Sequence, residues 1–257
     1  MNILDQLKNE MAALSSELAF KAEWVHHLHE TLPLYTRLPQ PLQDRLHHKI
    51  AAFVQSTHFE GCEGIELTTP IILSISGQAC LLVLSHEGPP YPGLNTVLLY
   101  PRAFSSTIES IEPDGQILET TVFCEGESWE DGTVRLAWDS VSGGARNISD
   151  GHNVTFHEFA HQLDALDGDI DGVPLLKSEE AFYTWAGVLG SHCAELIEQV
   201  TLGLKTVLDP YATTNPGEYF AVATETFFEK PKQFKAKHPD LYAELKDFYQ
   251  LDPVSWF

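Results

Sequence analysis

Apolar residues recur at alternating spacings of three and four near the start of the chain. The series consists of Leu4, Leu7, Met11, Leu14, Leu18, Val25 and Leu28. This spacing predicts an amphipathic helix whose apolar stripe is interrupted at Lys21. We expect the stripe to pack on its own domain, with docking to a partner as the less favoured alternative. Three prolines within residues 31–41 predict the end of this helix, and a second helix is expected from Leu42 to Phe53.

The middle of the chain contains short apolar runs. The run from Pro70 to Leu84 has β-branched residues that would suit a strand, but its Thr-Pro start favours a helix, which we predict. Three runs rich in β-branched and aromatic residues predict strands at Thr96–Tyr100, Ile117–Phe123 and Thr133–Trp138. Helical patterns follow at Ser178–Leu204, Pro216–Phe228 and Pro239–Tyr249. The order of these elements predicts an α+β protein with helices at both ends.

A His-Glu-x-x-His string, His157 to His161, lies between the predicted strands and the later helices. On a helix, residues four apart share one face, so both imidazoles can reach a single ion, and zinc favours nitrogen ligands. Glu158 is turned about 100° from His157 and could activate a water molecule at the metal. The alternative is a pair of surface or core histidines without a metal. The apolar neighbours favour a half-buried motif helix, because they form one stripe: Phe156, Phe159, Ala160 and Leu163.

A catalytic zinc site needs a third protein ligand, and four downstream glutamates are candidates. Glu179 and Glu180 also fit a plain helix start with acidic residues in the first turn. Glu218 and Glu225 lie on the helix that Asn215-Pro216 opens, where Glu218 also fits the third position of a capping box. The residue pattern alone leaves the choice open.

Three other features are weaker. The acidic segment Asp167–Gly172 begins like a calcium-binding EF-hand loop, but its twelfth position is Ser178, so an acidic turn is expected. His192 and Cys193 do not form a thiol-protease pair, because adjacent residues of a helix point apart. Asp164 could support a ligand histidine from behind.

The amino-acid composition limits the classes of partner that the chain is expected to bind. The 257 residues include 37 acidic and 15 basic side chains, and the net charge of −22 disfavours direct binding to nucleic acid or anionic membranes. The chain lacks a basic, apolar signal sequence at its start and any run of about 20 apolar residues. Four scattered cysteines suit buried thiols in a reducing compartment, so we expect a cytoplasmic protein.

Two longer stretches carry a family resemblance. They are NVTFHEFAHQLD from Asn153 and DPYATTNPGEYFAV from Asp209, and FEGCEGIEL from Phe59 and YPGLNTVLLYP from Tyr91 add to the likeness. The chain resembles the Mlc titration factor A family of glucose-regulated zinc metallopeptidases. The resemblance implies a zincin-like fold with a small mixed sheet, in one unit over residues 1–257. Within that unit we expect a helical portion at 1–60 and a catalytic portion at 61–257.

The same resemblance implies a set of site residues. In this family, and in the distantly similar catalytic domain of anthrax lethal factor, the third ligand is a glutamate seven residues after a tyrosine. This spacing falls on Glu218 after Tyr211. The resemblance therefore implies one zinc ion per chain on His157, His161 and Glu218, the gluzincin arrangement. It further implies Glu158 as general base and Tyr211 as hydrogen-bond donor to the oxyanion, whereas the sequence alone makes Tyr211 a core or turn aromatic.

Two functions follow as hypotheses. The first is aminopeptidase-like hydrolysis of peptides, with Thr133–Trp138 as an edge strand on which a substrate could align. The second is a regulatory protein that sequesters a transcription repressor, with the zinc site as scaffold or switch. A terminal segment such as Ser255–Phe257 could also cover the cleft until a partner binds.

Overall fold

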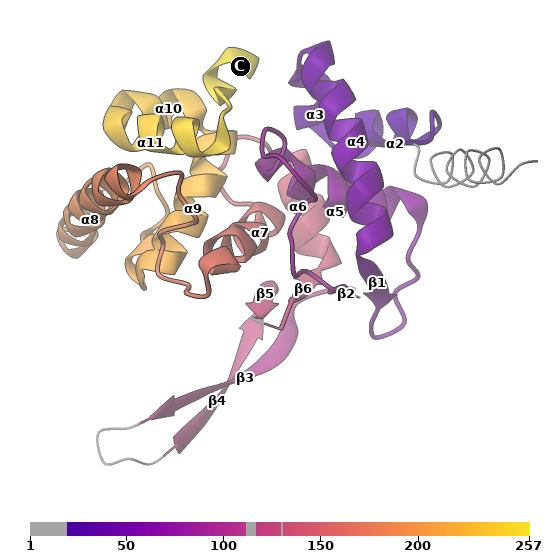
Figure 1. Cartoon of the computed structure of the whole chain (residues 1–257). Coiled ribbons are helices and arrows are strands. Elements are labelled where there is room, and N and C mark those ends of the chain that lie inside the picture. Colours follow the sequence, from indigo (N-terminus) through magenta and orange to yellow (C-terminus); the bar gives the residue numbers. More distant parts are fainter. Residues whose placement is uncertain (1–19, 112–116, 130) are drawn as a thin grey trace, which may run out of the picture.

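The computed structural model describes residues 20–111, 117–129 and 131–257. Most of the predicted N-terminal helix therefore lies outside the described residues. The predicted helix does not run unbroken to Leu28, because residues 20–23 are not helical and the first described helix begins at Trp24. Figure 1 shows the helices gathered on one side of a small sheet, with a long hairpin projecting away from them. The helices are α2 (Trp24–Thr31), α3 (Pro33–Arg37), α4 (Gln40–Ser56), α5 (Thr69–Leu82), α6 (Trp138–Arg146), α7 (Val154–Asp164), α8 (Glu179–Thr201), α9 (Pro216–Glu229), α10 (Pro231–Lys237) and α11 (Pro239–Tyr249).

The strands form two sheets. The four-stranded sheet has the order β1-β2-β6-β5, with β1, β2 and β6 parallel and β5 antiparallel to β6. The projecting hairpin pairs β3 with β4 in antiparallel register. The bounds are β1 (His58–Gly61), β2 (Thr96–Tyr100), β3 (Phe104–Ile111), β4 (Ile117–Cys124), β5 (Gly126–Trp129) and β6 (Thr133–Ala137). The fold is α+β, as the element order predicted, and it contains the small mixed sheet that the family resemblance implied.

The position of β6 corrects one prediction. The run Thr133–Trp138 was expected to be an edge strand, but β6 lies between β2 and β5 and pairs with both. The edge beside α7 is formed by β5, which the sequence pattern did not reveal. Trp138 does not end the strand, because it is the first residue of α6. Any substrate that adds a strand here would therefore pair with β5.

Burial explains which elements the pattern revealed. Strands β2 and β6 alternate between buried and partly buried positions, which is the period of two that predicted them. Helix α5 is buried on all sides from Leu73 to Leu82, so its sequence carries no amphipathic period, yet the predicted helix is confirmed. The predicted helices at Pro216 and Pro239 are confirmed too, while the short elements α3, α6, α10, β1 and β3 were not predicted.

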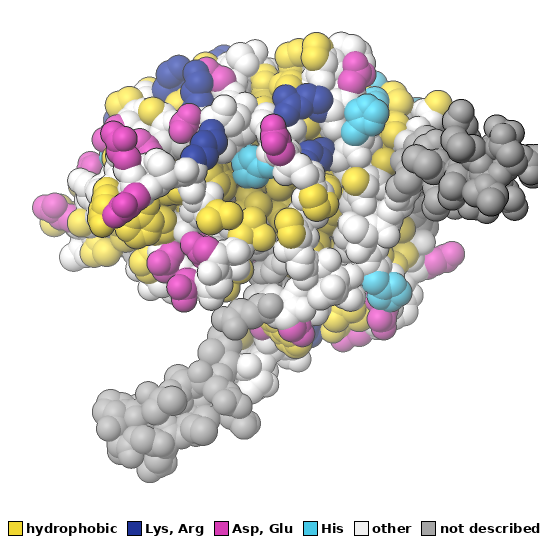
Figure 2. All heavy atoms as spheres, viewed as in Figure 1, with side chains coloured by type: hydrophobic (Ala, Val, Ile, Leu, Met, Phe, Trp, Pro, Cys, Tyr) yellow, Lys and Arg dark blue, Asp and Glu magenta, His cyan; other side chains and the backbone are white. Residues whose placement is uncertain are grey.

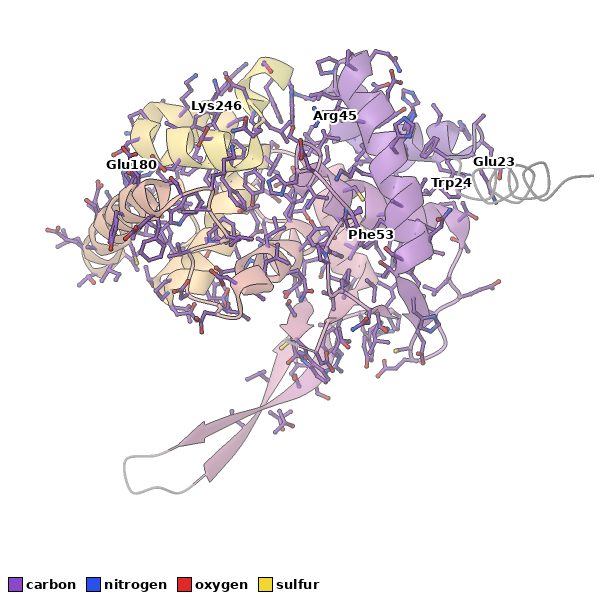
Figure 3. All side chains as sticks on the ribbon, in the orientation of Figure 1. Glu23, Trp24, Arg45, Phe53, Glu180 and Lys246 are labelled. Atoms are coloured by element: carbon purple, nitrogen blue, oxygen red, sulfur yellow. The ribbon has the colours of Figure 1, made fainter. Side chains whose placement is uncertain are left out.

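An aromatic core joins the N-terminal helices to the motif helix. Phe53 of α4, labelled in Figure 3, packs edge-on against Phe159 of α7 with ring centroids 5.7 Å apart. Tyr91 packs on the same Phe159 ring at 4.8 Å, and its hydroxyl group donates to the carbonyl oxygen of Ala79 at 2.6 Å. Each ring contributes a large apolar area, so these contacts fix α7 firmly against the core. Within the described part of the chain, no helix has both the length and the apolar character needed to span a membrane.

Candidate metal centre

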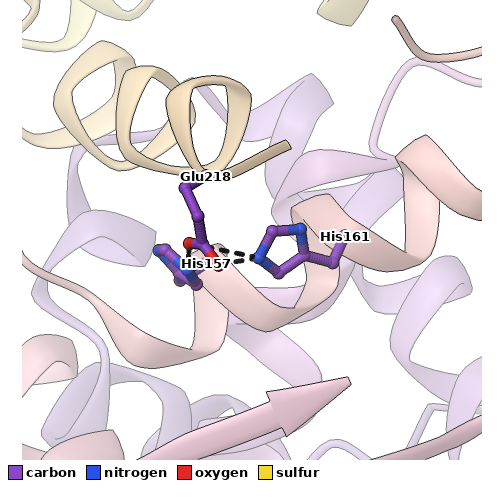
Figure 4. A group of neighbouring side chains, drawn as sticks. All are labelled: His157, His161 and Glu218. Atoms are coloured by element: carbon purple, nitrogen blue, oxygen red, sulfur yellow. Dashed lines mark hydrogen bonds and ion pairs between the residues drawn. The ribbon is translucent and has the colours of Figure 1, made fainter. Parts of the chain in front are cut away.

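The motif helix begins at a cap that its own sequence supplies. The Asn153 side chain accepts a hydrogen bond from the backbone N–H of Phe156 at 3.0 Å, which satisfies one of the free donors at the start of α7. The predicted apolar stripe is confirmed, since Phe156, Phe159 and Ala160 are fully buried and Leu163 is nearly so. The opposite side of α7 turns His157 and His161 toward the start of α9 (Figure 4).

The two histidines and one glutamate converge on one point. The Nε2 atoms of His157 and His161 are 3.3 Å apart, and Glu218 Oε2 lies 2.8 Å from the first and 3.5 Å from the second. Two nitrogens bound to one tetrahedral zinc ion at 2.0–2.1 Å are about 3.3 Å apart. The two nitrogens therefore have the separation of ligands on one zinc ion, and all three donor atoms are of a chemical type that zinc takes, while Glu218 Oε2 lies at hydrogen-bonding distance from His157 Nε2. Figure 4 shows Glu218 reaching down from α9 between the rings.

Local structure places Glu218 at this point. Asn215 caps α9 by accepting from the backbone N–H of Glu218 at 2.9 Å, so half of the predicted capping box is present. The Glu218 side chain does not complete the box, because it turns to the histidines instead. A side chain at Gly172 would come within 2.3 Å of the Pro216 carbonyl oxygen, so the turn after α7 packs closely against the start of α9. This contact holds the start of α9, and with it Glu218, close to the motif helix.

Glu225 is the buried partner of His157. Its Oε1 atom accepts from His157 Nδ1 at 2.8 Å, and its Oε2 atom accepts from the backbone N–H of Asn153. A carboxylate behind a ligand histidine fixes the ring tautomer and leaves Nε2 free for a metal. Of the two candidates on α9, Glu218 therefore faces the ion site and Glu225 stands behind it. The two lie seven residues apart, two turns on one helix face, and this spacing is the signal that the sequence interpretation did not use.

The other two ligand candidates lie elsewhere. Ser178 caps α8, and Glu179 and Glu180 occupy the first turn of that helix. Both are exposed, and Figure 3 shows Glu180 on α8, away from α7. They are helix-start carboxylates, the plainer of the two interpretations that the sequence allowed.

Glu158 lies beside the converging ligands at the wall of a cavity. It is only 6% exposed, and burial raises its pKa to about 7 even though His157 and His161 counteract the shift. The cavity has a volume of about 310 Å³, and its lining includes Glu158, Tyr211 and Gly126. A carboxyl group with a pKa near neutrality can both take up and return a proton at physiological pH.

Neighbouring charges and hydrogen bonds change the pKa values of His157 and Glu218. Burial lowers the pKa of His157, but hydrogen bonds with Glu218 and Glu225 outweigh this and raise it well above its ordinary value. Burial raises the pKa of Glu218, yet the hydrogen bonds from His157 and His161 bring it down to about 2. Glu218 is therefore ionised, and a metal ion that binds here displaces a proton from His157.

Tyr211 lies on the far side of the same cavity. It belongs to the 3-10 turn η2 (Pro210–Thr213), where Asp209 accepts from its backbone N–H at 2.8 Å. Its ring centroid is 6.0 Å from that of His157, and the side chain is 54% exposed. Burial of the hydroxyl and the charges of Glu218 and Glu158 raise its pKa to about 12, so the hydroxyl keeps its proton. Tyr211 is thus a half-exposed turn residue at the cavity, which fits the turn alternative of the sequence interpretation and excludes the core alternative.

The turn after α7 is acidic, as expected from its sequence. Asp164 accepts from the backbone N–H of Gly172 at 2.9 Å and so holds this turn, while its other oxygen and His161 Nδ1 are buried without a hydrogen-bond partner among the described residues. The predicted support of a ligand histidine by Asp164 is therefore not a hydrogen bond in this structure. Asp167 and Asp171 accept from backbone N–H groups two residues further on, as in Asx turns.

The C-terminal segment packs away from the cavity. The Phe257 ring lies 4.3 Å from the Arg37 guanidinium, and Trp256 is buried beside Phe228. Neither residue lines the cavity that contains Glu158. Cover of the cleft by Ser255–Phe257 is thus not seen, and residues 1–19 lie outside the described chain.

Comparison with known proteins gives matches along most of the chain. Residues 5–250 match the family model described as glucose-regulated metallo-peptidase M90. The chain is 41% identical to the uncharacterized protein slr2042 of Synechocystis, over 90% of this chain and 84% of the relative. It is 31% and 30% identical to proteins named Mlc titration factor A from Klebsiella pneumoniae and Escherichia coli, each over 87% of this chain and 84% of the relative.

Proposed function

Because the chain belongs to the glucose-regulated metallo-peptidase family M90, we propose that it is a zinc-dependent peptidase with a zincin-like active site. In this proposal His157, His161 and Glu218 bind one zinc ion per chain. The observation that carries it is the convergence of their three donor atoms, with the two nitrogens at the separation expected on a tetrahedral zinc ion. The orienting carboxylate of Glu225 gives further support, because such carboxylates accompany metal-bound histidines.

The proposed reaction is hydrolysis of a peptide bond. Zinc, when bound, supplies a Lewis acid for the peptide carbonyl group and lowers the pKa of a water molecule. Glu158 takes the proton of the attacking water and returns it to the leaving amine, for which its raised pKa is suited. The Tyr211 hydroxyl, which stays protonated, donates a hydrogen bond to the oxyanion as it develops.

The surroundings of the cavity support short peptides with a free amino group as substrates. Strand β5 forms one edge of the sheet, and none of the described strands pairs with its outer side, so an extended peptide can pair there. Glu125 and Asp209 line the cavity, and their carboxylates would complement the charge of a protonated amino terminus. This arrangement favours aminopeptidase-like action.

The experiment that tests this function compares wild type with Glu158→Gln. The variant keeps the shape of the side chain but cannot take up a proton, so we expect bound zinc to stay at one equivalent at this centre while hydrolysis of amino-acid amides stops. Glu180→Gln is the matched control, because Glu180 is an exposed carboxylate on α8. Undiminished hydrolysis by Glu158→Gln, with chelator-sensitive activity in both proteins, would contradict the mechanism.

A second function rests on the relatives and on charge. Relatives named Mlc titration factor A suggest that a transcription repressor is a partner, and the net charge of −22 suits a basic face of such a protein. Figure 2 shows the acidic side chains spread over one face, with most of the visible Lys and Arg in its upper half. We expect the affinity of this chain for a purified repressor to fall as salt rises. Equal binding by Glu158→Gln and wild type would assign the interaction to a surface other than the active site.

The proposed location is the cytoplasm. All four cysteines, Cys62, Cys80, Cys124 and Cys193, are free thiols. Free thiols suit a reducing compartment, and labelling of the protein with a thiol reagent after rapid cell lysis would show whether they stay reduced.

A further inference from the structure

A second group of histidine and acidic side chains lies where α8 meets the start of α11. His192 and Glu195 are three residues apart on α8, while His238 precedes α11 and Asp240 lies in its first turn. The ring centroids of the two histidines are 5.1 Å apart at an angle of 83°. His238 is 9% exposed and the His192 side chain 11%, so both rings are held in place by their surroundings. None of these residues belongs to the metal centre on α7 and α9.

The donor atoms of this group converge as they do at the first centre. His192 Nδ1 and His238 Nδ1 are 3.2 Å apart, and two nitrogens on a tetrahedral zinc ion are about 3.3 Å apart. Glu195 Oε2 lies 3.7 Å from His192 Nδ1, and one donor atom from each of the three residues lies within 4.8 Å of the others. The ligand set would be two imidazoles and a carboxylate, which is the set of the first centre as well.

Asp240 fixes the orientation of one ring. Its Oδ1 atom is 2.7 Å from His192 Nε2, and because an ionised carboxylate only accepts, Nε2 carries the proton. The lone pair of His192 Nδ1 then points at His238 and Glu195. This is the arrangement of Glu225 behind His157, reached independently on two other helices.

The charges around the group indicate which kind of ion fits. Lys205 and Lys237 line the same groove as Glu195 and His238, so they offset the acidic side chains. Calcium and magnesium ions depend on several oxygen ligands, so we expect this group to bind them weakly. An ion that bonds strongly to imidazole nitrogen, such as zinc, nickel or copper, does not depend on a strongly negative field.

We propose that His192, His238 and Glu195 form a second divalent-cation site, selective for zinc-class ions, that joins α8 to the start of α11. The site is separate from the proposed active site and does not depend on peptidase activity. The alternative is a plain hydrogen bond between the two histidine rings, which predicts that no ion binds there.

The test is a zinc titration of the full chain after chelator treatment, with bound metal measured by mass spectrometry. We expect two zinc ions per wild-type chain and one in the His192→Gln/His238→Gln double variant. Glu195→Gln should retain the fold, because this side chain is exposed, and should weaken the second ion about tenfold. His58→Ala is the control, since His58 is an exposed histidine beside a glutamate and belongs to neither centre, and it should keep both ions.

Replacing zinc with cobalt gives a spectroscopic readout of the second site that is independent of the first centre. In a His157→Ala background the remaining cobalt should still give the visible absorption bands of a low-coordinate site, and adding His238→Gln should remove them. One ion in wild type with no loss in the double variant would overturn the proposal, as would a second ion that survives in that variant. Failure of the proposed peptidase function would leave these results unchanged, because no activity is measured.

Discussion

The packing of β5 against α7 gives a sharp test of how Glu158 is positioned. Gly126, the first residue of β5, lies directly against the motif helix. A Cβ atom at this position would be 2.5 Å from Glu158 Oε1, 2.6 Å from Glu158 Cγ and 2.6 Å from Val154 Cγ2. Since ordinary carbon contacts need about 3.5 Å or more, the substitution Gly126→Ala must move Glu158 or Val154 by about 1 Å.

The expected loss follows from that displacement. A shift of about 1 Å in a catalytic group can cost about 100-fold in rate, which corresponds to about 2.7 kcal/mol of transition-state stabilisation. Zinc binding should persist, because the three atoms nearest to the added methyl group belong to Glu158 and Val154 and not to the proposed ligands. We therefore expect kcat/KM for an amino-acid amide to fall about 100-fold at an unchanged zinc content.

The assay pairs turnover with metal analysis and a glycine control. Gly143→Ala adds the same methyl group within α6, where nothing lies within 4 Å of the new atom, so activity should be retained. The reasoning would be refuted if Gly126→Ala kept full activity, or if it lost activity only because it lost zinc.

Three further predictions concern the surroundings of the centre. Glu225→Gln places an amide N–H against one of two hydrogen-bond donors, either His157 Nδ1 or the Asn153 backbone. The variant should therefore bind zinc about 10- to 100-fold more weakly in a chelator competition. Unchanged zinc affinity would count against an orienting role of Glu225. Tyr211→Phe should leave zinc and KM unchanged and lower kcat about 100-fold in steady-state kinetics, whereas a loss confined to KM would assign Tyr211 to substrate binding. Burial raises the pKa of Glu229 to about 9 from 4.5, so the folded chain loses stability as pH rises through this range. Glu229→Gln removes this loss but sets an amide N–H against one of two donors, the Gly151 backbone or the Asn153 side chain. Its stability relative to wild type should therefore rise by about 2–3 kcal/mol from pH 5 to pH 7 in zinc-free urea unfolding, and a difference independent of pH would contradict the assignment.

The sequence revealed the elements whose pattern depends on local burial. The alternation in Thr96–Tyr100 and the stripe around Phe159 each follow from one buried face, so both could be predicted. Strand β5 could not, because its four residues are partly exposed on a sheet edge and have no period of their own. The order of the strands was missed for the same reason: a sequence pattern records burial but not which neighbour lies beside a strand.

The same distinction applies to the site: local helix geometry predicts some of its residues, and only the tertiary fold or the family resemblance identifies the others. His157 and His161 share a helix face, so their convergence follows from helix geometry alone. The approach of Glu218 depends on the close packing of Gly172 on Pro216, a tertiary contact without a local signature. The spacing after Tyr211 pointed to Glu218 only through the family resemblance. The sequence suggested only Cys193 as a partner of His192, and that pair was rejected because adjacent residues of a helix point apart. His238 lies 46 residues away, and only the fold brings the two rings together.

The central claim is that two imidazoles on α7 and a carboxylate on α9 share one zinc ion. Diffraction data from zinc-soaked crystals, collected on both sides of the zinc absorption edge, test it most directly. We expect an anomalous peak between His157 Nε2, His161 Nε2 and Glu218 Oε2, about 2.0–2.1 Å from each nitrogen. No peak at this point, or an ion held by Glu225 in place of Glu218, would contradict it.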